Sequence, residues 1–500
     1  MTKKITVIGA GVAGLASAIR LQHEGYEVTI LEKGTAPGGK MNRIDLDGYK
    51  FDLGPTIVMM PELYREVFEL AGRDPEDYIP MQRLDPMYSG YFDNGQKQYQ
   101  VTNDLVRNIE MFEEISDEDA EGFMRYLSDL YHRFNIAKKH FLQRPFRNKK
   151  DFYNPFMIGQ GMKLKTLNNA ENLMKKYIKD KRMRQMISFQ TLYIGISPFK
   201  GPSLYTIIPM IEFLYGVWFI KGGMRTMASG MERLFKEMGG KIEYETSVNH
   251  IVIEDKEAVG VSAEGRFMPS DYVMCNADFP YAMKHLVREP EHKGKYQDEK
   301  IDRMDYSCSC FVLYLGMDRK YPEIDNVHNF VFSEDLDANI NGIFDGEMLE
   351  DPSLYMYIAS KMDESLAPEG KDGLYILMPI SDTSTMEYEW TDEVSRMYRD
   401  KIIRKISMLP GMENFEQEII SETMMTPLEF EGRFNAYNGA TFGLRPTLTQ
   451  SNHLRPQSKA THCENLYFTG SSTHPGAGVP IVLLSSKIAV EELLKDDNHR

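Results

Sequence analysis

Residues 5–32, ITVIGAGVAGLASAIRLQHEGYEVTILE, decide the fold of this chain. Residues 5–8 are all β-branched, which is typical of a short buried strand in a parallel sheet. A glycine-rich turn follows, and apolar residues then recur at helical spacing until the next glycine. Residues 26–31 form a second strand-like run. This order of strand, turn, helix and strand predicts a parallel βαβ unit at the start of the protein.

Three glycines and one acidic residue within this unit have the spacing of a dinucleotide-binding site. Gly9 permits the tight turn, Gly11 lets the backbone approach a pyrophosphate, and Gly14 lets the helix pack closely on the strand. Glu32 ends the second strand, where a carboxylate accepts hydrogen bonds from an adenosine ribose. Glycines at these offsets alone are a weak signal, so the prediction depends on the strands, helix and acid around them.

The composition describes a large globular protein that does not bind nucleic acid. The chain has 500 residues, enough for two or more domains, and its net charge of −16 repels nucleic acid. The first residues lead straight into the glycine motif without a secretory signal. The four cysteines are scattered, so we expect buried thiols in a reducing cytoplasm rather than disulfides or a metal site.

Residues 133–184 differ in charge from the rest of the chain. They contain 15 Lys or Arg against three acidic residues, a net +12, which leaves −28 for the remainder. Residues 204–220 follow and carry Glu212 as their only charge, but they are short and interrupted for a membrane span. We expect this apolar segment and the basic one to dock together on an anionic cytoplasmic membrane surface. A buried core helix is the alternative interpretation of residues 204–220.

The C-terminal part offers a second place where backbone N–H groups converge. Residues 465–470 predict a strand closed by glycine, residues 471–480 (SSTHPGAGVP) a loop of small residues, and residues 481–494 a helix. The N-terminus of such a helix favours a negative or electron-rich group. No second G-x-G-x-x-G in strand context and no C-x-x-x-x-C pair is present, which disfavours a separate nicotinamide domain and a disulfide reductase.

These motifs together resemble the flavin-dependent amine oxidase and phytoene desaturase superfamily. The glycine motif with its acid, Gly38-Gly39 with a cation, Asp52-x-Gly54-Pro55, Gly222-Gly223-Met224 with Val248, and the C-terminal return occur there in this order. The stretches THPGAGVP (473–480), GPTIVMMP (54–61), LYIGI (192–196), GPSLY (201–205) and IKGGM (220–224) make the chain most similar to bacterial carotenoid desaturases. The similarity runs from end to end. Lys40 departs from it, since most members have Arg there, which keeps the charge but loses a bidentate phosphate contact.

The resemblance implies an α/β fold with a Rossmann-type FAD-binding domain, as in glutathione reductase and the amine oxidases. It further implies an inserted substrate domain of mixed sheet and helices. On this interpretation residues 1–75, 220–300 and 430–500 form a discontinuous FAD-binding domain. Residues 76–219 are then a helical region for membrane docking and substrate, and residues 301–429 a substrate-binding sheet region.

The resemblance also implies how the chain holds FAD. The glycine motif would bind the pyrophosphate and Val248 would lie on the adenine side, while the helix that starts near Pro480 directs its positive end at the flavin ring. The expected cofactor-binding set is Ile8, Gly9, Gly11, Val12, Ala13, Gly14, Glu32, Lys33, Gly39, Lys40, Gly54, Pro55, Thr56, Val248, Gly470, Val479 and Pro480. His474 is the nearest titratable candidate for a catalytic base, with a structural role as the alternative.

The activity implied by the resemblance is FAD-dependent desaturation of a C30 carotenoid precursor, dehydrosqualene (4,4'-diapophytoene), to 4,4'-diaponeurosporene in staphyloxanthin-type biosynthesis. A hydride leaves an allylic carbon for the flavin, and the neighbouring carbon loses a proton. A long polyene implies an apolar tunnel, a protein at the inner face of the cell membrane, and a quinone or oxygen as electron acceptor. A diapocarotenoid oxygenase or isomerase, and a non-catalytic prenyl-lipid escort protein of the same fold, are the alternatives.

Overall fold

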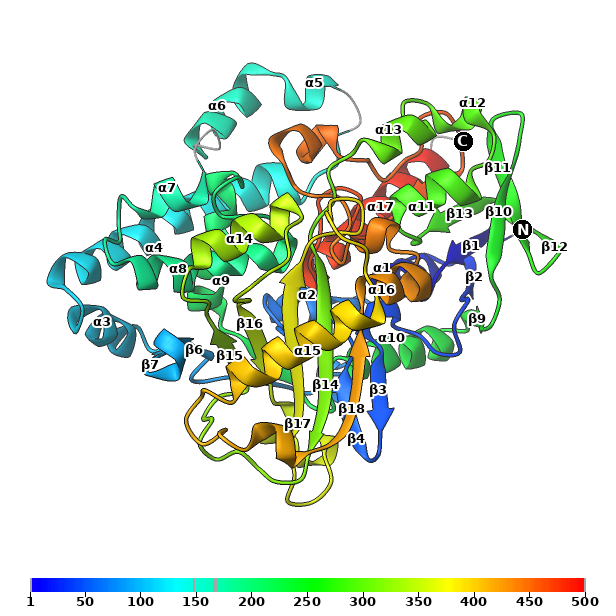
Figure 1. Cartoon of the computed structure of the whole chain (residues 1–500). Coiled ribbons are helices and arrows are strands. Elements are labelled where there is room, and N and C mark those ends of the chain that lie inside the picture. Colours follow the sequence, from blue (N-terminus) through cyan, green and yellow to red (C-terminus); the bar gives the residue numbers. More distant parts are fainter. Residues whose placement is uncertain (1, 147–148, 165–168, 499–500) are drawn as a thin grey trace.

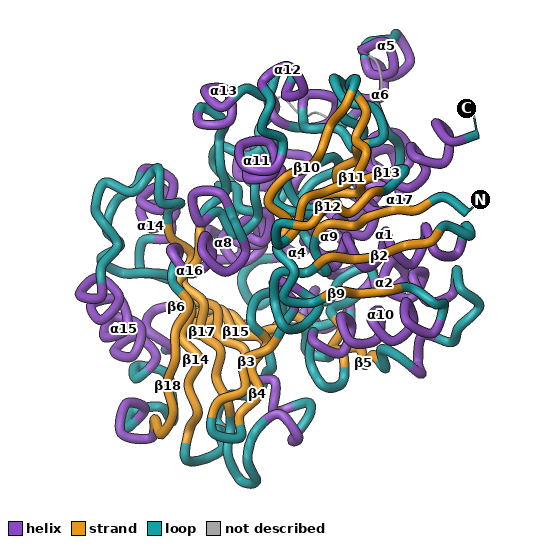
Figure 2. Tube along the Cα trace, turned by 90° about the vertical axis from the view of Figure 1, so that its right-hand side faces the viewer, coloured by secondary structure: helices purple, strands orange, loops and turns teal. Residues whose placement is uncertain are grey.

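Two β-sheets organise the protein, whose computed structural model describes residues 2–146, 149–164 and 169–498 (Figures 1 and 2). The first sheet is parallel and has the strand order β19-β13-β1-β2-β9. Its strands are β1 (Lys4–Ile8), β2 (Glu27–Leu31), β9 (Lys241–Glu243), β13 (Tyr272–Cys275) and β19 (Leu466–Phe468). The chain therefore returns to this sheet three times after its first βαβ unit, at β9, β13 and β19.

The helices of the parallel sheet follow the predicted pattern closely. Helix α1 (Val12–His23) begins directly after Gly11 and packs between α10 (Arg225–Glu237) and α17 (Val479–Asp497). Apolar side chains of β1 and α1 are buried because parallel strands are covered on both faces. As a result, the N-termini of α1 and α17 both lie at the edge of the sheet where the strands end.

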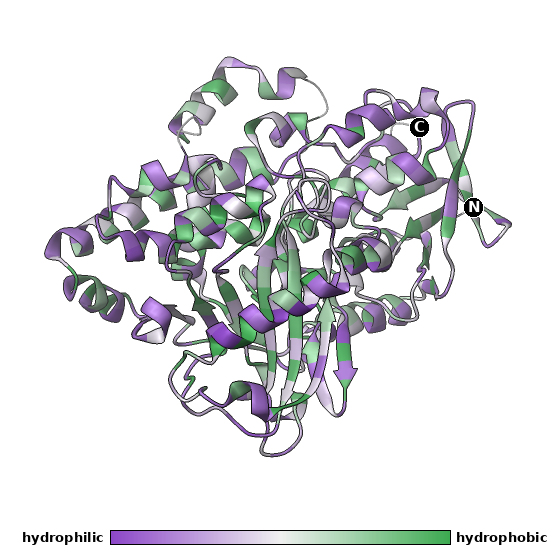
Figure 3. Ribbon diagram, in the orientation of Figure 1, coloured by the Kyte–Doolittle hydropathy of each residue, from purple (hydrophilic) through white to green (hydrophobic). Residues whose placement is uncertain are grey.

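The second sheet is larger and mostly antiparallel, with the order β18-β14-β17-β16-β15-β6-β7. Every residue of the long strand β14 is buried, and only the pair β15–β6 is parallel. Helix α15 (Asp392–Ile406) crosses this sheet in Figure 1, and Figure 3 shows it largely hydrophilic while the strands beside it are largely hydrophobic. The strands are β6 (Tyr88–Phe92), β7 (Lys97–Val101), β14 (Ser309–Met317), β15 (His328–Val331), β16 (Leu354–Tyr357), β17 (Gly373–Ile380) and β18 (Ile419–Met425).

A helical layer covers one end of the second sheet. Two strands of this sheet, β6 and β7, come from residues 76–219, which were expected to be helical. The same part of the chain also contains the strand at residues 81–83 and the start of the strand at residues 218–220, which pair with each other. The helices of this part are α3 (Leu105–Glu113), α4 (Asp117–Ala137), α5 (Lys149–Phe152), α6 (Pro155–Lys163), α7 (Ala170–Met174), α8 (Lys181–Ser188) and α9 (Ile207–Tyr215). Three further sheets are smaller: β10-β11-β12, β3-β4 and β5-β8. Their strands are β3 (Arg43–Leu46), β4 (Tyr49–Asp52), β5 (Met81–Arg83), β8 (Trp218–Ile220), β10 (Val248–Glu254), β11 (Glu257–Ala263) and β12 (Arg266–Pro269).

The remaining helices lie between and around the sheets. They are α2 (Pro61–Glu69), α11 (Phe279–Tyr281), α12 (Pro290–Lys293), α13 (Asp298–Asp302), α14 (Leu336–Asp345), α15 (Asp392–Ile406) and α16 (Pro427–Phe434).

The apolar segment expected on the membrane surface is a core helix instead. Residues 207–212 of α9 are buried, and α9 packs against α4. Its apolar side chains contact protein on several sides, which is why the segment is hydrophobic without facing lipid. Within the three described ranges, no helix is both long enough and apolar enough to cross a bilayer.

Candidate active site

A cavity of about 840 Å³ extends from the carboxyl edge of the parallel sheet to the second sheet. One half is lined by backbone-rich loops of residues 8–60, 246–281 and 430–482. The other half is lined by apolar side chains of residues 134–211 and 308–379. All of the predicted cofactor-binding residues line this cavity except Gly14, which lies behind its wall.

The glycine turn after β1 forms a cradle that leaves no room for side chains. Gly9 has a φ of +90°, which favours glycine, and a Cβ at Gly14 would lie 2.0 Å from the Gly9 carbonyl oxygen. A Cβ at Gly11 would lie 2.7 Å from Nδ2 of Asn276. Gly11 also precedes α1 without a side-chain cap, and the first turn of α1 has no acidic residue. The helix N–H groups are therefore available to an anion.

Glu32 braces this cradle from the end of β2. Its two carboxylate oxygens accept hydrogen bonds from the backbone N–H groups of Ala10 and Gly34, each at 2.7 Å. The next residue, Lys33, points to a different loop, where Nζ donates to Oδ1 of Asn435 at 2.8 Å. Both residues line the cavity, but only Glu32 is tied to the glycine turn.

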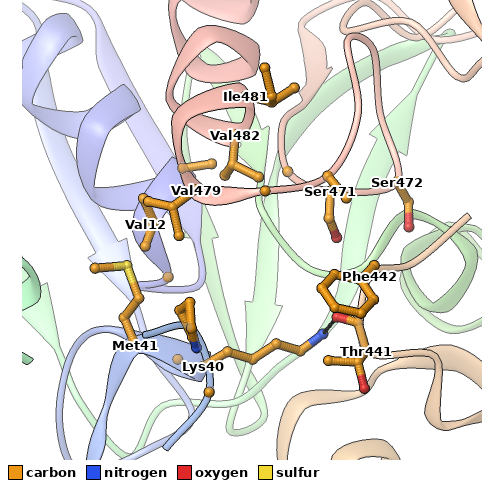
Figure 4. Close-up of a pocket in the computed structure, with 18 of the residues that line it drawn as sticks. Val12, Lys40, Met41, Thr441, Phe442, Ser471, Ser472, Val479, Ile481 and Val482 are labelled. Atoms are coloured by element: carbon orange, nitrogen blue, oxygen red, sulfur yellow. Dashed lines mark hydrogen bonds between the residues drawn. The ribbon is translucent and has the colours of Figure 1, made fainter. Parts of the chain in front are cut away.

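Lys40 crosses the cavity away from the glycine cradle (Figure 4). Its Nζ donates to the carbonyl oxygen of Thr441 at 2.7 Å, whereas Val12 lies on the opposite side of the picture. Burial lowers the pKa of Lys40, and the nearby Asp278 and Cys310 partly offset that effect. The ammonium thus lies deep in the cavity, beside a carboxyl whose own pKa burial raises.

The C-terminal loop and α17 form the wall of the cavity beside the start of α1, and Val479 lies next to Val12 in Figure 4. Gly470 and Gly478 have φ values of +125° and +96°, so the loop between them turns in ways that favour glycine. Gly478 precedes α17 without a side-chain cap, and Pro480 occupies the first turn, which contains no acidic residue. Val479 and Pro480 both line the cavity. A second helix N-terminus therefore points its positive end at the same space.

The far half of the cavity is an apolar chamber. Its described lining side chains carry no charge, and helices α4 and α9 meet strands β15 and β17 around it. They include Phe134, Phe141, Phe189, Ile208, Ile211 and Leu377. Such a chamber suits a long hydrocarbon and excludes water from the point where it meets the glycine-rich half.

Residues 54–56 stand where the two halves join. The Tyr375 hydroxyl donates to the Gly54 carbonyl oxygen at 3.0 Å, and the Thr56 and Tyr355 hydroxyls are 2.6 Å apart. Gly54 itself packs against the backbone of Lys40, where a Cβ would lie 2.7 Å from the carbonyl oxygen. Aromatic strands of the second sheet thus hold this loop in place.

His474 is not among the residues that line the cavity. Its ring is buried, with Nε2 at 3.0 Å from the Arg144 carbonyl oxygen and an edge-on contact to Phe146. Burial lowers the pKa of His474 to about 4, so the ring is neutral near pH 7. This geometry fits the structural role that was the alternative at the sequence level.

Sequence reasoning missed several residues that line the glycine-rich half. Asn276 and Asp278 directly follow β13, and the rule that ligands bind beyond the carboxyl ends of parallel strands was enough to predict them. Thr441 and Phe442 have no such local signal, because only tertiary folding brings their loop to the cavity.

Comparison with known proteins identifies the family. The family model of flavin-containing amine oxidoreductases matches residues 12–494. The chain belongs to this family. It is 45% identical over 498 residues to a 4,4'-diapophytoene desaturase (4,4'-diaponeurosporene-forming) of Staphylococcus haemolyticus, covering 99% of both chains. A Staphylococcus aureus protein of the same description is 46% identical over 497 residues, again covering 99% of both.

Two solved structures show that other proteins share this fold. An oxidoreductase from Methanosarcina mazei has a TM-score of 0.66 at 16% identity and covers 98% of this chain and 100% of its own. A putrescine oxidase triple mutant has a TM-score of 0.63 at 11% identity and covers 99% of both. The predicted fold class, superfamily and flavin cofactor are thereby confirmed.

The residues present fit such a cofactor. A Cβ at Gly11 would collide with Asn276 and one at Gly14 with the Gly9 carbonyl oxygen, and two uncapped helix N-termini open onto the same cavity. These features suit a negatively charged pyrophosphate and an electron-accepting ring.

Proposed function

We propose that this protein is an FAD-dependent 4,4'-diapophytoene desaturase that forms 4,4'-diaponeurosporene. The observation that carries the proposal is the continuity of the cavity, in which a nucleotide cradle opens directly into an uncharged hydrocarbon chamber. The relatives at 45% and 46% identity over their whole length are described by this reaction.

The cofactor-binding residues follow from the lining of the glycine-rich half. Gly9 and Gly11 with the start of α1 would hold the pyrophosphate, Glu32 the ribose, and Val248 the adenine side. Gly54–Thr56, Gly470 and the start of α17 would surround the flavin ring. Bound FAD supplies the acceptor for the hydride that leaves the allylic carbon. The chain itself aligns the polyene and keeps the reacting bond dry.

The domain division expected from the sequence is part of this proposal. Residues 1–75, 220–300 and 430–500 would bind FAD, and they contain all five strands of the parallel sheet. Residues 76–219 and 301–429 would together enclose the polyene, since both contribute to the chamber and to the second sheet.

The proposal includes docking on an anionic membrane, with α6 as the docking element. Helix α6 and the residues just before it lie at the edge of the molecule, and Figure 3 shows hydrophobic residues on α6 there. The exposed apolar side chains are those of Phe156 (56%), Ile158 (50%) and Met162 (71%) on α6 and of Tyr153 (56%) just before it. Lys139, Lys150 and Lys163 are exposed in the same part of the chain. Apolar side chains beside lysines suit an anionic lipid surface.

The docking element lies next to the cavity lining. Phe156 contacts the ring of His140 at 5.2 Å between centroids, and Phe152 contacts His453 at 4.1 Å. The neighbouring residues Phe141 and Asn452 line the cavity. A polyene dissolved in the bilayer would therefore reach the chamber over a short path. The electron acceptor that reoxidises the enzyme would be a quinone or oxygen.

The test is a single anaerobic turnover. Purified protein loaded with FAD is mixed with 4,4'-diapophytoene in phosphatidylglycerol vesicles while the flavin absorption is recorded. We expect the oxidised flavin band to bleach as absorption bands of a longer conjugated polyene rise. A rearranged lipid without flavin bleaching would indicate an isomerase, and bound but unchanged lipid beside oxidised flavin would indicate an oxygenase, which needs oxygen to react. Lipid binding by a protein that never retains flavin would indicate an escort protein.

A further inference from the structure

Two hydroxyl groups lie together on the cavity wall where the glycine-rich half meets the chamber. Thr56 follows the Gly54-Pro55 turn, Tyr355 belongs to β16, and both line the cavity. Their oxygens are 2.6 Å apart, and both side chains are buried from bulk solvent. The proposed function places Thr56 beside the flavin ring but gives the two hydroxyl groups no chemical role.

An imidazole lies directly behind this pair. Nδ1 of His328 on β15 is 2.7 Å from the Tyr355 hydroxyl, and β15 and β16 are hydrogen-bonded neighbours. The His328 ring stacks on Tyr355 and on Tyr357, with interplanar angles of 20° and 14°. Its Nε2 has no hydrogen-bond partner among the described residues. Thr56, Tyr355 and His328 therefore form a single file from the cavity to a buried ring nitrogen.

The surroundings keep this imidazole neutral. Burial lowers the pKa of His328 to about 3, so the ring is a neutral imidazole near pH 7 and not an imidazolium. Tyr357, which stacks on His328, donates a hydrogen bond from its hydroxyl to the carboxyl of Asp52 at 3.2 Å. A neutral ring is ready to accept a proton from a strong acid, and an allylic carbocation is one.

We propose that Thr56, Tyr355 and His328 form a relay that removes the substrate proton in the desaturation proposed above, on which this inference rests. One allylic C–H bond breaks, and its hydrogen leaves with both bonding electrons as a hydride that the flavin accepts. The electron pair of the neighbouring C–H bond becomes the new C=C bond. Its proton passes to the Thr56 oxygen as the Thr56 proton moves to Tyr355 and the Tyr355 proton to Nδ1 of His328.

The relay is restored when the enzyme is reoxidised. A quinone that becomes a hydroquinone takes up a hydride equivalent and one proton, which balances the hydride and the proton that the substrate lost. The proton stored on His328 returns along the same hydroxyls, and burial favours its departure because a buried imidazolium is unfavourable. Thr56 is then the residue that contacts the reacting carbon, and Tyr355 and His328 act through it.

The relay is tested by isotope effects on product formation. Two substrates are prepared, one deuterated at the carbon that loses the hydride and one at the carbon that loses the proton. We expect Tyr355→Phe and His328→Phe to slow product formation by about 10²-fold, a loss typical of removing acid–base assistance. The isotope effect at the proton-losing carbon should rise from near unity to a primary value, and the effect at the other carbon should not rise.

The controls separate the relay from general damage to the cavity wall. Tyr375→Phe removes a hydroxyl from the same wall, but that hydroxyl is bonded to the Gly54 carbonyl and not to an imidazole. We expect this variant to keep the isotope effects of the unaltered protein. Thr56→Ser should keep them as well, whereas Thr56→Val should behave like Tyr355→Phe.

A second measurement needs no turnover. The relay requires Tyr355 to donate to His328, so His328 must hold its proton on Nε2. The tautomer is measured by ¹⁵N NMR of histidine-labelled protein without substrate. The His328 signal is assigned by its loss in His328→Phe, and we expect it to show the proton on Nε2. An Nδ1-protonated ring, or unchanged isotope effects in Tyr355→Phe and Thr56→Val, would overturn the relay while the desaturase stands. Unaltered protein whose flavin never bleaches would overturn the proposed function and the relay with it.

Discussion

At the scale of single residues, two aspartates hold the Gly222-Gly223-Met224 turn and respond to pH in opposite directions. Asp52 is buried and accepts a hydrogen bond from the Met224 N–H at 2.7 Å. Asp363 accepts one from the Gly222 N–H at 2.9 Å. Burial raises the pKa of Asp52 to about 7 in spite of its hydrogen bonds. Burial also acts on Asp363, but hydrogen bonds from Ser365 and Gly222 outweigh it and lower that pKa.

We predict that the unaltered protein loses stability as pH rises because Asp52 ionises, and that the Asp52→Asn protein lacks this loss. Because the folded-state pKa of Asp52 is raised, its contribution is fully present below pH 4 and is lost as pH rises toward 7. The loss is on the order of a few kcal/mol, at about 1.4 kcal/mol for each unit of pKa. Urea unfolding of the Asp52→Asn protein and the unaltered protein between about pH 4.5 and 7.5 measures the difference in their free energies of unfolding. This difference should grow with pH.

Asp363→Asn is the matched control for this measurement. Its lowered pKa means that its carboxylate stabilises the fold above the unfolded pKa and that this contribution is lost in acid. Above the unfolded pKa, that is across the whole range of the urea measurement, this contribution is complete. The stability difference between the Asp363→Asn protein and the unaltered protein should therefore stay constant with pH there, whereas the difference for Asp52→Asn should grow. Parallel pH profiles for the two variants would contradict the opposite assignments.

At the scale of elements, α6 exposes large apolar side chains that no other part of the described chain covers. A triple variant, Phe156→Ser with Ile158→Ser and Met162→Ser, should bind phosphatidylglycerol vesicles at least about tenfold more weakly. The reason is that each removed side chain contributes on the order of 1 kcal/mol or more when it enters lipid. Vesicle flotation measures the bound fraction, and added salt should weaken binding further through the exposed lysines.

Phe267→Ser provides the control for the docking element. Phe267 is also 54% exposed, but it belongs to β12, far from α6 in the molecule (Figure 1). We expect this variant to float with vesicles like the unaltered protein. Equal loss of binding in both variants would indicate nonspecific adsorption of exposed apolar side chains to the vesicles. No loss of binding in the α6 variant would reject α6 as the docking element.

At the scale of the whole molecule, the cavity joins segments that are distant in sequence. Residues 8–60, 246–281 and 430–482 share its glycine-rich half, so a molecule bound there would hold these segments together. FAD at 100 times its Kd should stabilise the protein by about 2.7 kcal/mol. In hydrogen exchange, removal of FAD should expose the glycine turn and residues 470–480, while amides in the centre of β14 stay protected.

Two results would contradict this view of the cavity. One is protection that is unchanged by FAD in the glycine turn, which would move the cofactor elsewhere. The other is a loss of protection confined to the second sheet, which would separate the cofactor from the parallel sheet. Intact-mass analysis and flavin absorption before exchange verify that the cofactor was removed.

Much of the fold and of the cofactor cradle could be predicted because both depend on short stretches. The βαβ unit uses consecutive residues, and the glycine spacing reflects steric limits that hold within a single turn. The predicted strand at residues 5–8 corresponds to β1, and the predicted C-terminal helix corresponds to α17. Hydrophobic periodicity was informative there because each element packs with one regular pattern.

Tertiary contacts decided what periodicity left open. Residues 204–220 are equally apolar whether they face lipid or protein, and only packing against α4 placed α9 in the core. His474 stands in a cofactor-like motif, yet a hydrogen bond to Arg144, distant in sequence, holds it outside the cavity lining. His328 carries no local signal, and it lies behind Thr56 only because β15 and β16 pair in one register. The sequence by itself determined the cradle, whose chemistry is local, whereas the chamber depends on contacts between distant segments that only the folded chain brings together.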